Sequence, residues 1–444
     1  MTRPPPLSAL SPEDLAAATA PRLLGRVEDV VGFLARARLP GAAVGDVVRV
    51  EAGDGRSVDA EVVGLRDRSA LLVARGSFEG VQTASRVERL EGARFVACSD
   101  AMLGRVLGPD GIPIDRENGP LAGPFTRRPL RAPPPPALDR PPIDTPLLVG
   151  LRAIDGLLTL GRGQRIGIFA GPGVGKSHLL GRLARQADAQ VRVLALVGER
   201  GREVGEFLHH ILPPEARRST VTVVATSDRA AVDRMRAALV AHTIAAHFAA
   251  TGRTVLLMLD SLTRFAMAGR EVGLALGEPP ATRGYPPSVF TALPQMLERA
   301  GPYPGGGSVT AIYTVLVEGD DPRDPVADTT RAILDGHIVL SRDLAGRGHF
   351  PAIKVTQSVS RVADRVLQPA HHAVASAMRR LIADLEEAEE LRAIGAYEKG
   401  VAPHLDFAMA RREAIGDFLR QEDGPTPFPE VVRAMVSLTE GMPR

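Results

Sequence analysis

The chain has 444 residues, of which 44% are hydrophobic and 24% are charged, and its 54 basic residues nearly balance its 52 acidic ones. This length predicts two to three domains with packed cores. The formal net charge of +2 gives no global reason to bind nucleic acid. The single cysteine, Cys98, excludes an internal disulfide and is typical of a reducing cytosol.

The start of the chain has no secretory or membrane signature. Met1-Thr-Arg-Pro-Pro-Pro lacks the apolar segment of a secretory signal, and no run of 18 apolar residues follows anywhere. We therefore expect a soluble cytoplasmic protein, which partners could still hold at a membrane. Ser11 and Pro12 have the residue types of a helix N-cap and first helical position. This pattern predicts a partner-binding segment at 1–22, with a frayed terminus as an equal alternative.

Short β-strand patterns alternate with Gly and Asp turn signals between residues 23 and 95. The runs are 44–50, 58–63, 70–74 and 94–97. Strands of this length predict a small β-barrel domain over 23–95. An oligonucleotide-binding barrel would need exposed aromatic rings to stack bases, and the aromatic residues of this region are Phe33, Phe78 and Phe95. A structural barrel is therefore favoured, and no nucleic-acid partner is expected.

The remainder of the chain is predicted to hold an extended connection, an α/β domain and a helical domain. Many prolines predict the extended connection over 107–146. Strand and helix patterns then alternate, which indicates a mostly parallel sheet with helices on both faces. The expected strands are 165–170, 191–197, 220–225, 254–259, 308–316 and 336–341, and the expected helices are about 177–187, 203–212, 229–250 and 287–299. We assign the α/β domain to 96–365 and a C-terminal helical domain to 366–444, with the helical pattern ending near residue 421.

The strongest functional motif lies at 165–183, where an apolar run leads into a glycine-rich turn and then a helix. This is the context of a phosphate-binding loop with the spacing G-x-x-x-x-G-K-[ST], although Ala170 takes the first position. Backbone N–H groups and the helix N-terminus attract phosphate oxygens, Lys176 reaches the β- and γ-phosphates, and Ser177 can ligate Mg²⁺. The residues predicted to bind the nucleotide are Gly171, Pro172, Gly173, Val174, Gly175, Lys176, Ser177 and His178.

Two carboxylates follow predicted strands of the same sheet, Glu199 after 191–197 and Asp260 after 254–259. Ligands of parallel α/β sheets bind at the carboxyl ends of the strands, so both should face the phosphate loop. An aspartate directly after an apolar strand is costly to bury unless it faces a cation. We therefore expect Asp260 to hold the water shell of Mg²⁺ and Glu199 to orient and polarise the attacking water.

Four further stretches carry a resemblance to a known family. The stretches 198–207, 259–268, 277–290 and 334–342 resemble the flagellar protein-export ATPase, a type III secretion ATPase. That family is similar to the catalytic subunits of rotary ATP synthases. The resemblance extends over roughly 25–420, while the first 20 residues and the tail after 421 match little. It implies a RecA-like P-loop ATPase core in a homohexameric ring whose nucleotide sites lie between subunits.

The resemblance also implies roles for single residues. Glu199 falls on the catalytic carboxylate of the Gly-Glu-Arg motif, with Arg200 beside it, and Asp260 takes the magnesium-associated role. Phe350 occupies the place of an aromatic residue, usually tyrosine, that stacks on adenine, and only its ring face is needed for this. Arg361 matches an arginine finger that a neighbouring subunit contributes.

The function implied is ATP hydrolysis that energises export of flagellar proteins. The implied partners are other copies of the chain, a regulatory or stalk protein, export-gate membrane proteins, export substrates and their chaperones. The protein would be cytoplasmic, peripherally at the inner-membrane export apparatus. The nearest alternative is the ATPase of a virulence-type injectisome, although Leu262 and the run 267–271 favour the flagellar system.

Three other classes are disfavoured. A non-catalytic ring subunit would lack Glu199. An RNA translocase similar to the terminator Rho would need a basic, aromatic-bearing N-terminal domain. A rotary ATP synthase subunit fits the run 277–287 poorly.

Overall fold

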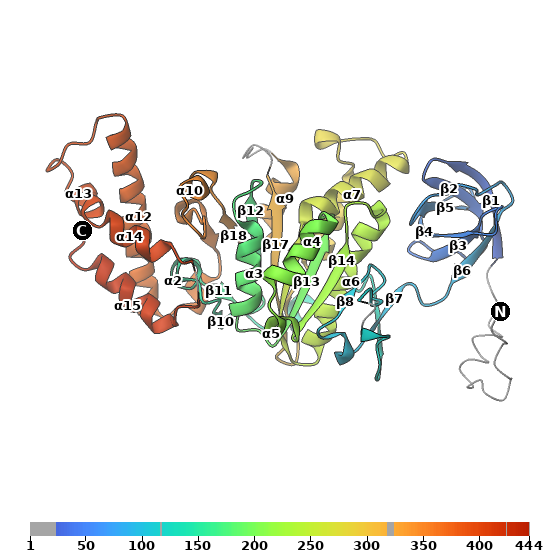
Figure 1. Ribbon diagram of the computed structural model, residues 1–444, viewed down its shortest axis with the longest axis horizontal. Coiled ribbons are helices and arrows are strands. Elements are labelled where there is room, and N and C mark those ends of the chain that lie inside the picture. Colours follow the sequence, from blue (N-terminus) through green and yellow to red (C-terminus); the bar gives the residue numbers. More distant parts are fainter. Residues whose placement is uncertain (1–23, 116–117, 318–323, 423, 444) are drawn as a thin grey trace. The chain divides into compact units, whose positions relative to one another are not determined.

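The computed structural model describes residues 24–115, 118–317, 324–422 and 424–443 (Figure 1). The chain forms two compact units, with the boundary between Arg94 and Phe95. The partner-binding segment predicted at 1–22 lies outside the described residues. None of the helices in the described ranges is long and apolar enough to cross a membrane.

The first unit is a closed barrel whose strands follow the order β1-β2-β5-β4-β3-β6. The strands are β1 (Leu24–Val31), β2 (Leu34–Arg38), β3 (Val47–Glu51), β4 (Ser57–Arg66), β5 (Ser69–Ala74) and β6 (Arg86–Leu90). Alternate side chains point inward, as in β3, where Val48 and Val50 are buried and Arg49 between them is exposed. The predicted small barrel is confirmed.

One strand assigned to the barrel belongs to the second unit. The run 94–97 becomes β7 (Phe95–Cys98), which pairs with β9 (Thr126–Pro129) in a separate two-stranded sheet. Its inward residues, Val96 and Cys98, are buried in the core of the second unit. The prediction was wrong because alternation identifies a strand but not the sheet that it joins. The connection predicted over 107–146 accordingly contains β9 as well as extended chain.

A nine-stranded sheet organises the second unit, in the order β19-β18-β12-β17-β15-β13-β14-β8 with β16 beside β17. The strands are β8 (Val106–Leu107), β12 (Arg165–Ala170), β13 (Val191–Val197), β14 (Thr220–Ala225), β15 (Thr254–Asp260), β16 (Gly301–Pro302), β17 (Ser308–Leu316), β18 (Gly336–Val339) and β19 (Val359–Ser360), and β10 (Pro146–Leu147) pairs with β11 (Leu160–Gly161) outside this sheet. The central strands β12, β17, β15, β13 and β14 pair in parallel, so their carboxyl ends share one edge. The predicted parallel α/β sheet is confirmed.

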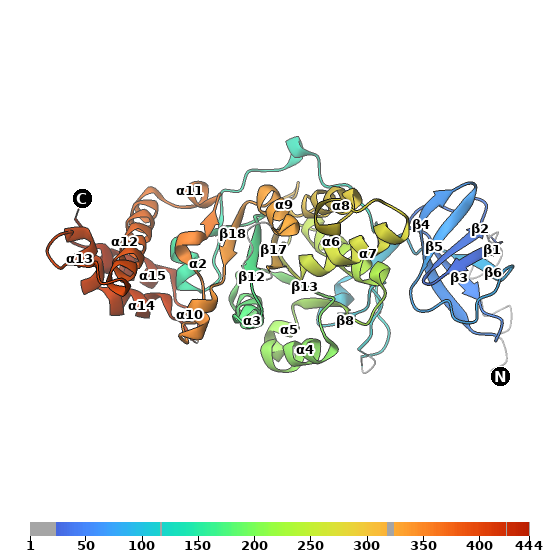
Figure 2. The ribbon, with the colours of Figure 1, turned by 90° about the horizontal axis from the view of Figure 1, so that it is seen from above.

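Helices cover both faces of this sheet (Figure 2). In β13, Leu194 and Leu196 belong to the apolar core that includes α3, whereas Val193 and Ala195 belong to the core beneath α6 to α9. The face helices are α3 (Lys176–Gln186), α4 (Gly201–Glu206) with a π-helical turn at Phe207–Ile211, α5 (Pro214–Arg217), α6 (Ala231–Ala250), α7 (Leu262–Ala275), α8 (Pro287–Leu297) and α9 (Pro325–Ile333). Helices α7 and α9 were not among the expected elements.

The C-terminal residues form helices that pack on the sheet domain. They are α12 (Pro369–Ala393), α13 (Pro403–Ala410), α14 (Arg412–Leu419) and α15 (Phe428–Thr439), preceded along the chain by α2 (Arg152–Leu157), α10 (Arg342–Gly346) and α11 (Ala363–Val366). The expected end of the helical pattern near 421 is wrong, because α15 follows it. Its Val431 and Met435 pack so closely on α2 that a Cβ at Gly156 would lie 2.9 Å from the Met435 sulfur.

Candidate active site

The phosphate-binding loop joins β12 to α3 at the carboxyl edge of the sheet. Strand β12 ends at Ala170 and α3 begins at Lys176. Gly173 and Gly175 adopt φ angles of 77° and 87°, which side chains on L-residues disfavour. Gly171 leaves room for a neighbouring side chain, because a Cβ there would lie 2.5 Å from Nε of Arg342 and the guanidinium would have to move. The loop therefore presents its backbone and the N-terminus of an 11-residue helix to a ligand.

Lys176 and the two predicted carboxylates meet at this edge. Its Nζ lies 2.5 Å from Oδ1 of Asp260 and 3.7 Å from Oε1 of Glu199. The side chains of Lys176, Glu199 and Asp260 are 13%, 13% and 5% exposed. Strands β13 and β15 are neighbours, so Glu199, just after β13, and Asp260, the last residue of β15, converge although they are far apart in the sequence. The structure thus brings together the lysine and both carboxylates.

Burial and the neighbouring charges together set the pKa values of this cluster. Burial by itself would lower the pKa of Lys176, but the negative charges of Asp260 and Glu199 raise it above its ordinary value. Burial raises the pKa of Glu199 to about 7, the charge of Asp260 adds to this, and Lys176 opposes it. A carboxylate with a pKa close to the working pH is suited to accept a proton from water.

Sequence reasoning missed Thr314. Its hydroxyl donates a 2.6 Å hydrogen bond to Oδ1 of Asp260 from the neighbouring strand β17. The bond holds Asp260 in one orientation toward Lys176. The sequence alone does not predict this bond. Helices α7 and α8 separate β15 from β17 along the chain, and no local sequence pattern indicates that the two strands pair.

Phe350 lies beside the phosphate loop. A Cβ at Gly175 would be 3.1 Å from Cε1 of its ring, and the residue is 40% exposed. The backbone N–H of Gln421 donates a 2.9 Å hydrogen bond to the carbonyl of Phe350. An exposed ring next to the loop is positioned for the predicted stacking on adenine, which stays a prediction.

Two predicted arginines do not join the cluster within one chain. Arg200 precedes α4, and its side chain is 80% exposed with Nη1 3.8 Å from Glu203. Arg361 is exposed and follows β19. Its backbone N–H donates a hydrogen bond to the carbonyl of Asp335, the residue before β18. It therefore lies at the amino ends of the strands. The six residues of β12, about 20 Å at roughly 3.3 Å per residue, separate that end from the phosphate loop.

The site fits a magnesium ion that arrives with a nucleotide. Among the described residues no group donates a hydrogen bond to the buried Oε1 of Glu199. The described ranges also contain no group of three or more His, Cys, Asp or Glu side chains that could hold a metal by themselves. Mg²⁺ commonly binds one or two carboxylates and completes its shell with water and substrate phosphates. Asp260 and the Ser177 hydroxyl are the groups that would hold it, and it would neutralise phosphate charge.

The fold and this cluster define a class. A phosphate loop between a central parallel strand and a helix, with a buried lysine and two carboxylates at adjacent strand ends, is the arrangement of a P-loop nucleotide-binding ATPase domain.

Comparisons with known proteins show which P-loop ATPases this chain is similar to. Residues 150–360 match the ATP synthase alpha/beta family, nucleotide-binding domain, and residues 367–437 match the T3SS EscN ATPase C-terminal domain. The chain is 46% identical over 429 residues to the "Type 3 secretion system ATPase" of Pseudomonas syringae pv. syringae, covering 96% of this chain and 95% of that protein. It is 48% identical over 401 residues to the "Flagellum-specific ATP synthase" of Treponema pallidum, covering 90% and 89%.

A solved structure of similar fold supports the same family. The assembled ATPase EscN from the enteropathogenic E. coli type III secretion system superposes with a TM-score of 0.87 at 43% identity, covering 94% of this chain and 100% of that chain. The chain therefore belongs to the family of type 3 secretion system and flagellum-specific ATPases. The match to residue 437 corrects the expectation that the tail after 421 has little in common with the family.

Proposed function

We propose that this protein hydrolyses ATP in a homohexameric ring and thereby energises export of proteins through a type III secretion apparatus, in the first instance that of the flagellum. The meeting of Lys176, Glu199 and Asp260 at the phosphate loop, in a chain of this family, carries the proposal.

Each residue of the cluster has a distinct task. Lys176 binds the β- and γ-phosphates, and before nucleotide binds the two carboxylates stabilise its positive charge. Glu199 orients and polarises the attacking water and accepts its proton. Asp260, held by Thr314, and Ser177 face the magnesium ion that accompanies ATP. Phe350 stacks on adenine, and Arg361 reaches the nucleotide of a neighbouring subunit.

The assembly and the partners are inferred from relatives. EscN is described as an assembled ATPase, and also in complex with its central stalk EscO. These structures support a ring of copies of this chain around a stalk protein. By the same reasoning, export-gate membrane proteins, export substrates and chaperones are the remaining partners, and the ring works on the cytoplasmic side of the inner membrane.

An injectisome is the second candidate. The C-terminal match is to a T3SS EscN domain, and relatives with either name are similarly identical to this chain, at 46% and 48%. A strain that lacks the protein distinguishes the two systems. Loss of the flagellar filament with normal secretion of other proteins supports flagellar export, and the reverse supports an injectisome. Unchanged export in both systems would contradict the proposed function.

The pH dependence of ATP hydrolysis tests the role of Glu199. Because its pKa in the free enzyme is raised to about 7, the carboxyl group is largely protonated below that pH and cannot accept a proton. We expect kcat/KM to rise with pH through about 7 and then level off, since kcat/KM reports the free enzyme.

Asp155 provides the control for this measurement. Burial also raises its pKa to about 7, but it lies in α2 and accepts hydrogen bonds from the N–H groups of Val149 and Gly150. Asp155→Asn should keep the inflection. A profile that is flat through neutral pH, or an inflection that disappears in Asp155→Asn, would contradict the assignment to Glu199.

A further inference from the structure

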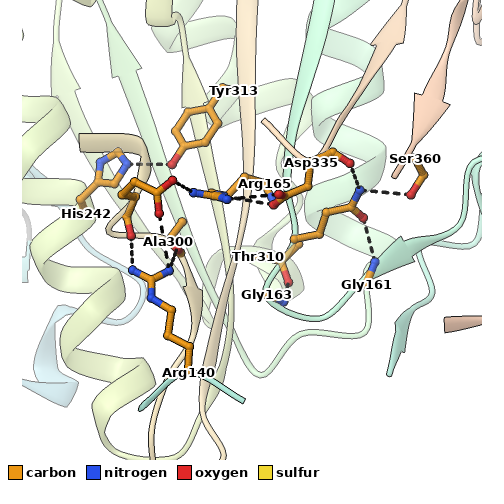
Figure 3. A network of polar contacts seen from close by, with 12 residues as sticks. Arg140, Gly161, Gly163, Arg165, His242, Ala300, Thr310, Tyr313, Asp335 and Ser360 are labelled. Carbon is orange, nitrogen blue, oxygen red and sulfur yellow. Dashed lines mark hydrogen bonds and ion pairs between the residues drawn. The ribbon is translucent and has the colours of Figure 1, made fainter. Parts of the chain in front are cut away.

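Asp335 joins the first residue of β12, Arg165, to the segment that carries Arg361. Figure 3 shows Asp335 with Arg165 on one side and Ser360, the residue before Arg361, on the other. Its carboxylate accepts hydrogen bonds from three groups of Arg165: the backbone N–H and Nε, both at 3.0 Å, and Nη2 at 3.1 Å. Forked pairs of this kind fix direction as well as distance. Asp335 is therefore clamped to the amino end of the strand whose other end leads into the phosphate loop.

The backbone of Asp335 holds the segment of Arg361. Its carbonyl accepts the N–H of Arg361 at 2.9 Å and Nε2 of Gln164 at 3.0 Å. Gln164 is fully buried, and the same Nε2 also donates to the hydroxyl of Ser360 at 3.1 Å. That hydroxyl in turn donates to the carbonyl of Thr159 at 2.8 Å. The main chain at Arg361 is thus tied to the sheet from two sides.

The side chain of Arg361 is held much less firmly. It is exposed, and within the described residues its Nη2 donates a 3.3 Å hydrogen bond to the carbonyl of Arg331. The network therefore fixes where the arginine starts and leaves its guanidinium at the surface. This is the arrangement required of a cation that is presented to another molecule.

We propose that Asp335 is a positioning residue for Arg361, which it holds where the arginine can reach the nucleotide of a neighbouring subunit. The inference rests on the proposed function, because it takes Arg361 to act across a subunit interface. Asp335 touches neither the phosphate loop nor the carboxylates of its own chain among the described residues. Its effect should therefore appear in the neighbour's site and not in its own.

The first test is the variant Asp335→Asn, which keeps the size of the side chain but turns one of its acceptors into a donor facing Arg165. A displacement of about 1 Å of a catalytic group costs on the order of 10²-fold in rate. We expect kcat to fall by about 10- to 100-fold with KM for ATP little changed, since ATP binds at the opposite end of β12.

Asp115→Asn is the matched control. Asp115 also forms a bidentate pair with an arginine: its carboxylate accepts hydrogen bonds from Nε and Nη2 of Arg105 at 2.9 and 2.8 Å. It also accepts a hydrogen bond from the backbone N–H of Val106 at 3.0 Å. It is bonded to Val106 of β8, the strand at the end of the sheet order remote from β18 and β19. It should lower thermal stability to a similar degree without a comparable loss of kcat. An equal loss of kcat in both variants would reduce Asp335 to a stabilising residue.

Mixed rings decide in which site Asp335 acts. A mixture of Asp335→Asn with Glu199→Gln contains interfaces with an intact Glu199 on one side and a correctly held Arg361 on the other, so turnover should exceed the average of the two pure proteins. A mixture of Asp335→Asn with Arg361→Ala contains no such interface and should show no gain. The opposite pattern, gain only in the second mixture, would overturn the proposal because it places the defect in the site of the same chain.

Arg361→Ala mixed with Glu199→Gln is the reference. If turnover rises in this reference mixture but not in the mixture of Asp335→Asn with Glu199→Gln, only the positioning role of Asp335 is overturned. If turnover does not rise in the reference mixture, Arg361 does not act across the interface, and the proposed arrangement of the site is overturned as well. If Asp335→Asn does not fold, Ser360→Ala removes the Gln164 bond to β19 and should show the same pattern of mixtures with a smaller loss of kcat.

Discussion

Replacing Arg361 by alanine is expected to lower ATP turnover by about 10³–10⁵-fold while ATP binding and assembly persist. An arginine that stabilises charge on the transferring phosphoryl group has an effect of this size in related chemistry. The fold should tolerate the change, because the side chain is exposed and makes a 3.3 Å hydrogen bond at the surface, whereas the 2.9 Å bond to Asp335 comes from the backbone N–H, which alanine keeps. Since Arg361 lies at the far end of β12 from the phosphate loop, the loss would come from another subunit's site.

The dependence on protein concentration is the decisive measurement. Activity per subunit of the unchanged protein should rise as rings assemble, and Arg361→Ala should stay near the lowest value throughout. Arg365→Ala is the control, because Arg365 is an exposed arginine of the neighbouring helix α11. Full activity of a verified monomer, or normal turnover by Arg361→Ala, would show that the arginine does not act across an interface.

Glu199→Gln is expected to bind ATP normally and to hydrolyse it about 10²–10⁴-fold more slowly, the range of general acid–base contributions. Glutamine keeps the shape of the side chain but cannot accept a proton. It also removes the repulsion between Glu199 and Asp260 that contributes to the raised pKa, so thermal stability should not fall.

Direct titration with a fluorescent ATP analogue separates binding from hydrolysis in this variant. Glu206→Gln is a suitable control, because Glu206 is an exposed carboxylate at the end of the adjoining helix α4. It should retain most of the activity. Failure of Glu199→Gln to bind the analogue would indicate that Glu199 has a structural role instead.

Local patterns were sufficient for most of the individual elements. The long apolar runs of β13 and β15 predicted buried parallel strands because they do not alternate apolar with polar residues. The helical pattern was expected to end before α15, whose start carries two prolines, Pro427 and Pro429, and proline inside a helix breaks it. In the first turn, however, proline costs nothing, since the N–H groups there have no partner within the helix.

The predicted domain limits and the roles of single site residues remain predictions. The structure brings Lys176, Glu199 and Asp260 together, and leaves Arg200 in solvent within one chain. The convergence was predictable because all three residues lie at or just after the carboxyl ends of parallel strands, and these ends share an edge.

The sequence by itself determined the phosphate loop, the parallel α/β class and the two carboxylates, because each depends on a short run of residues and the period of its side chains. Only the tertiary structure decided which strands are neighbours. That order sets Thr314 against Asp260, moves β7 out of the barrel, and ties Arg361 through Asp335 to the end of β12 remote from its own phosphate loop. The physical reason is that strand pairing links segments distant along the chain, and the period of a strand specifies its faces but not its partner.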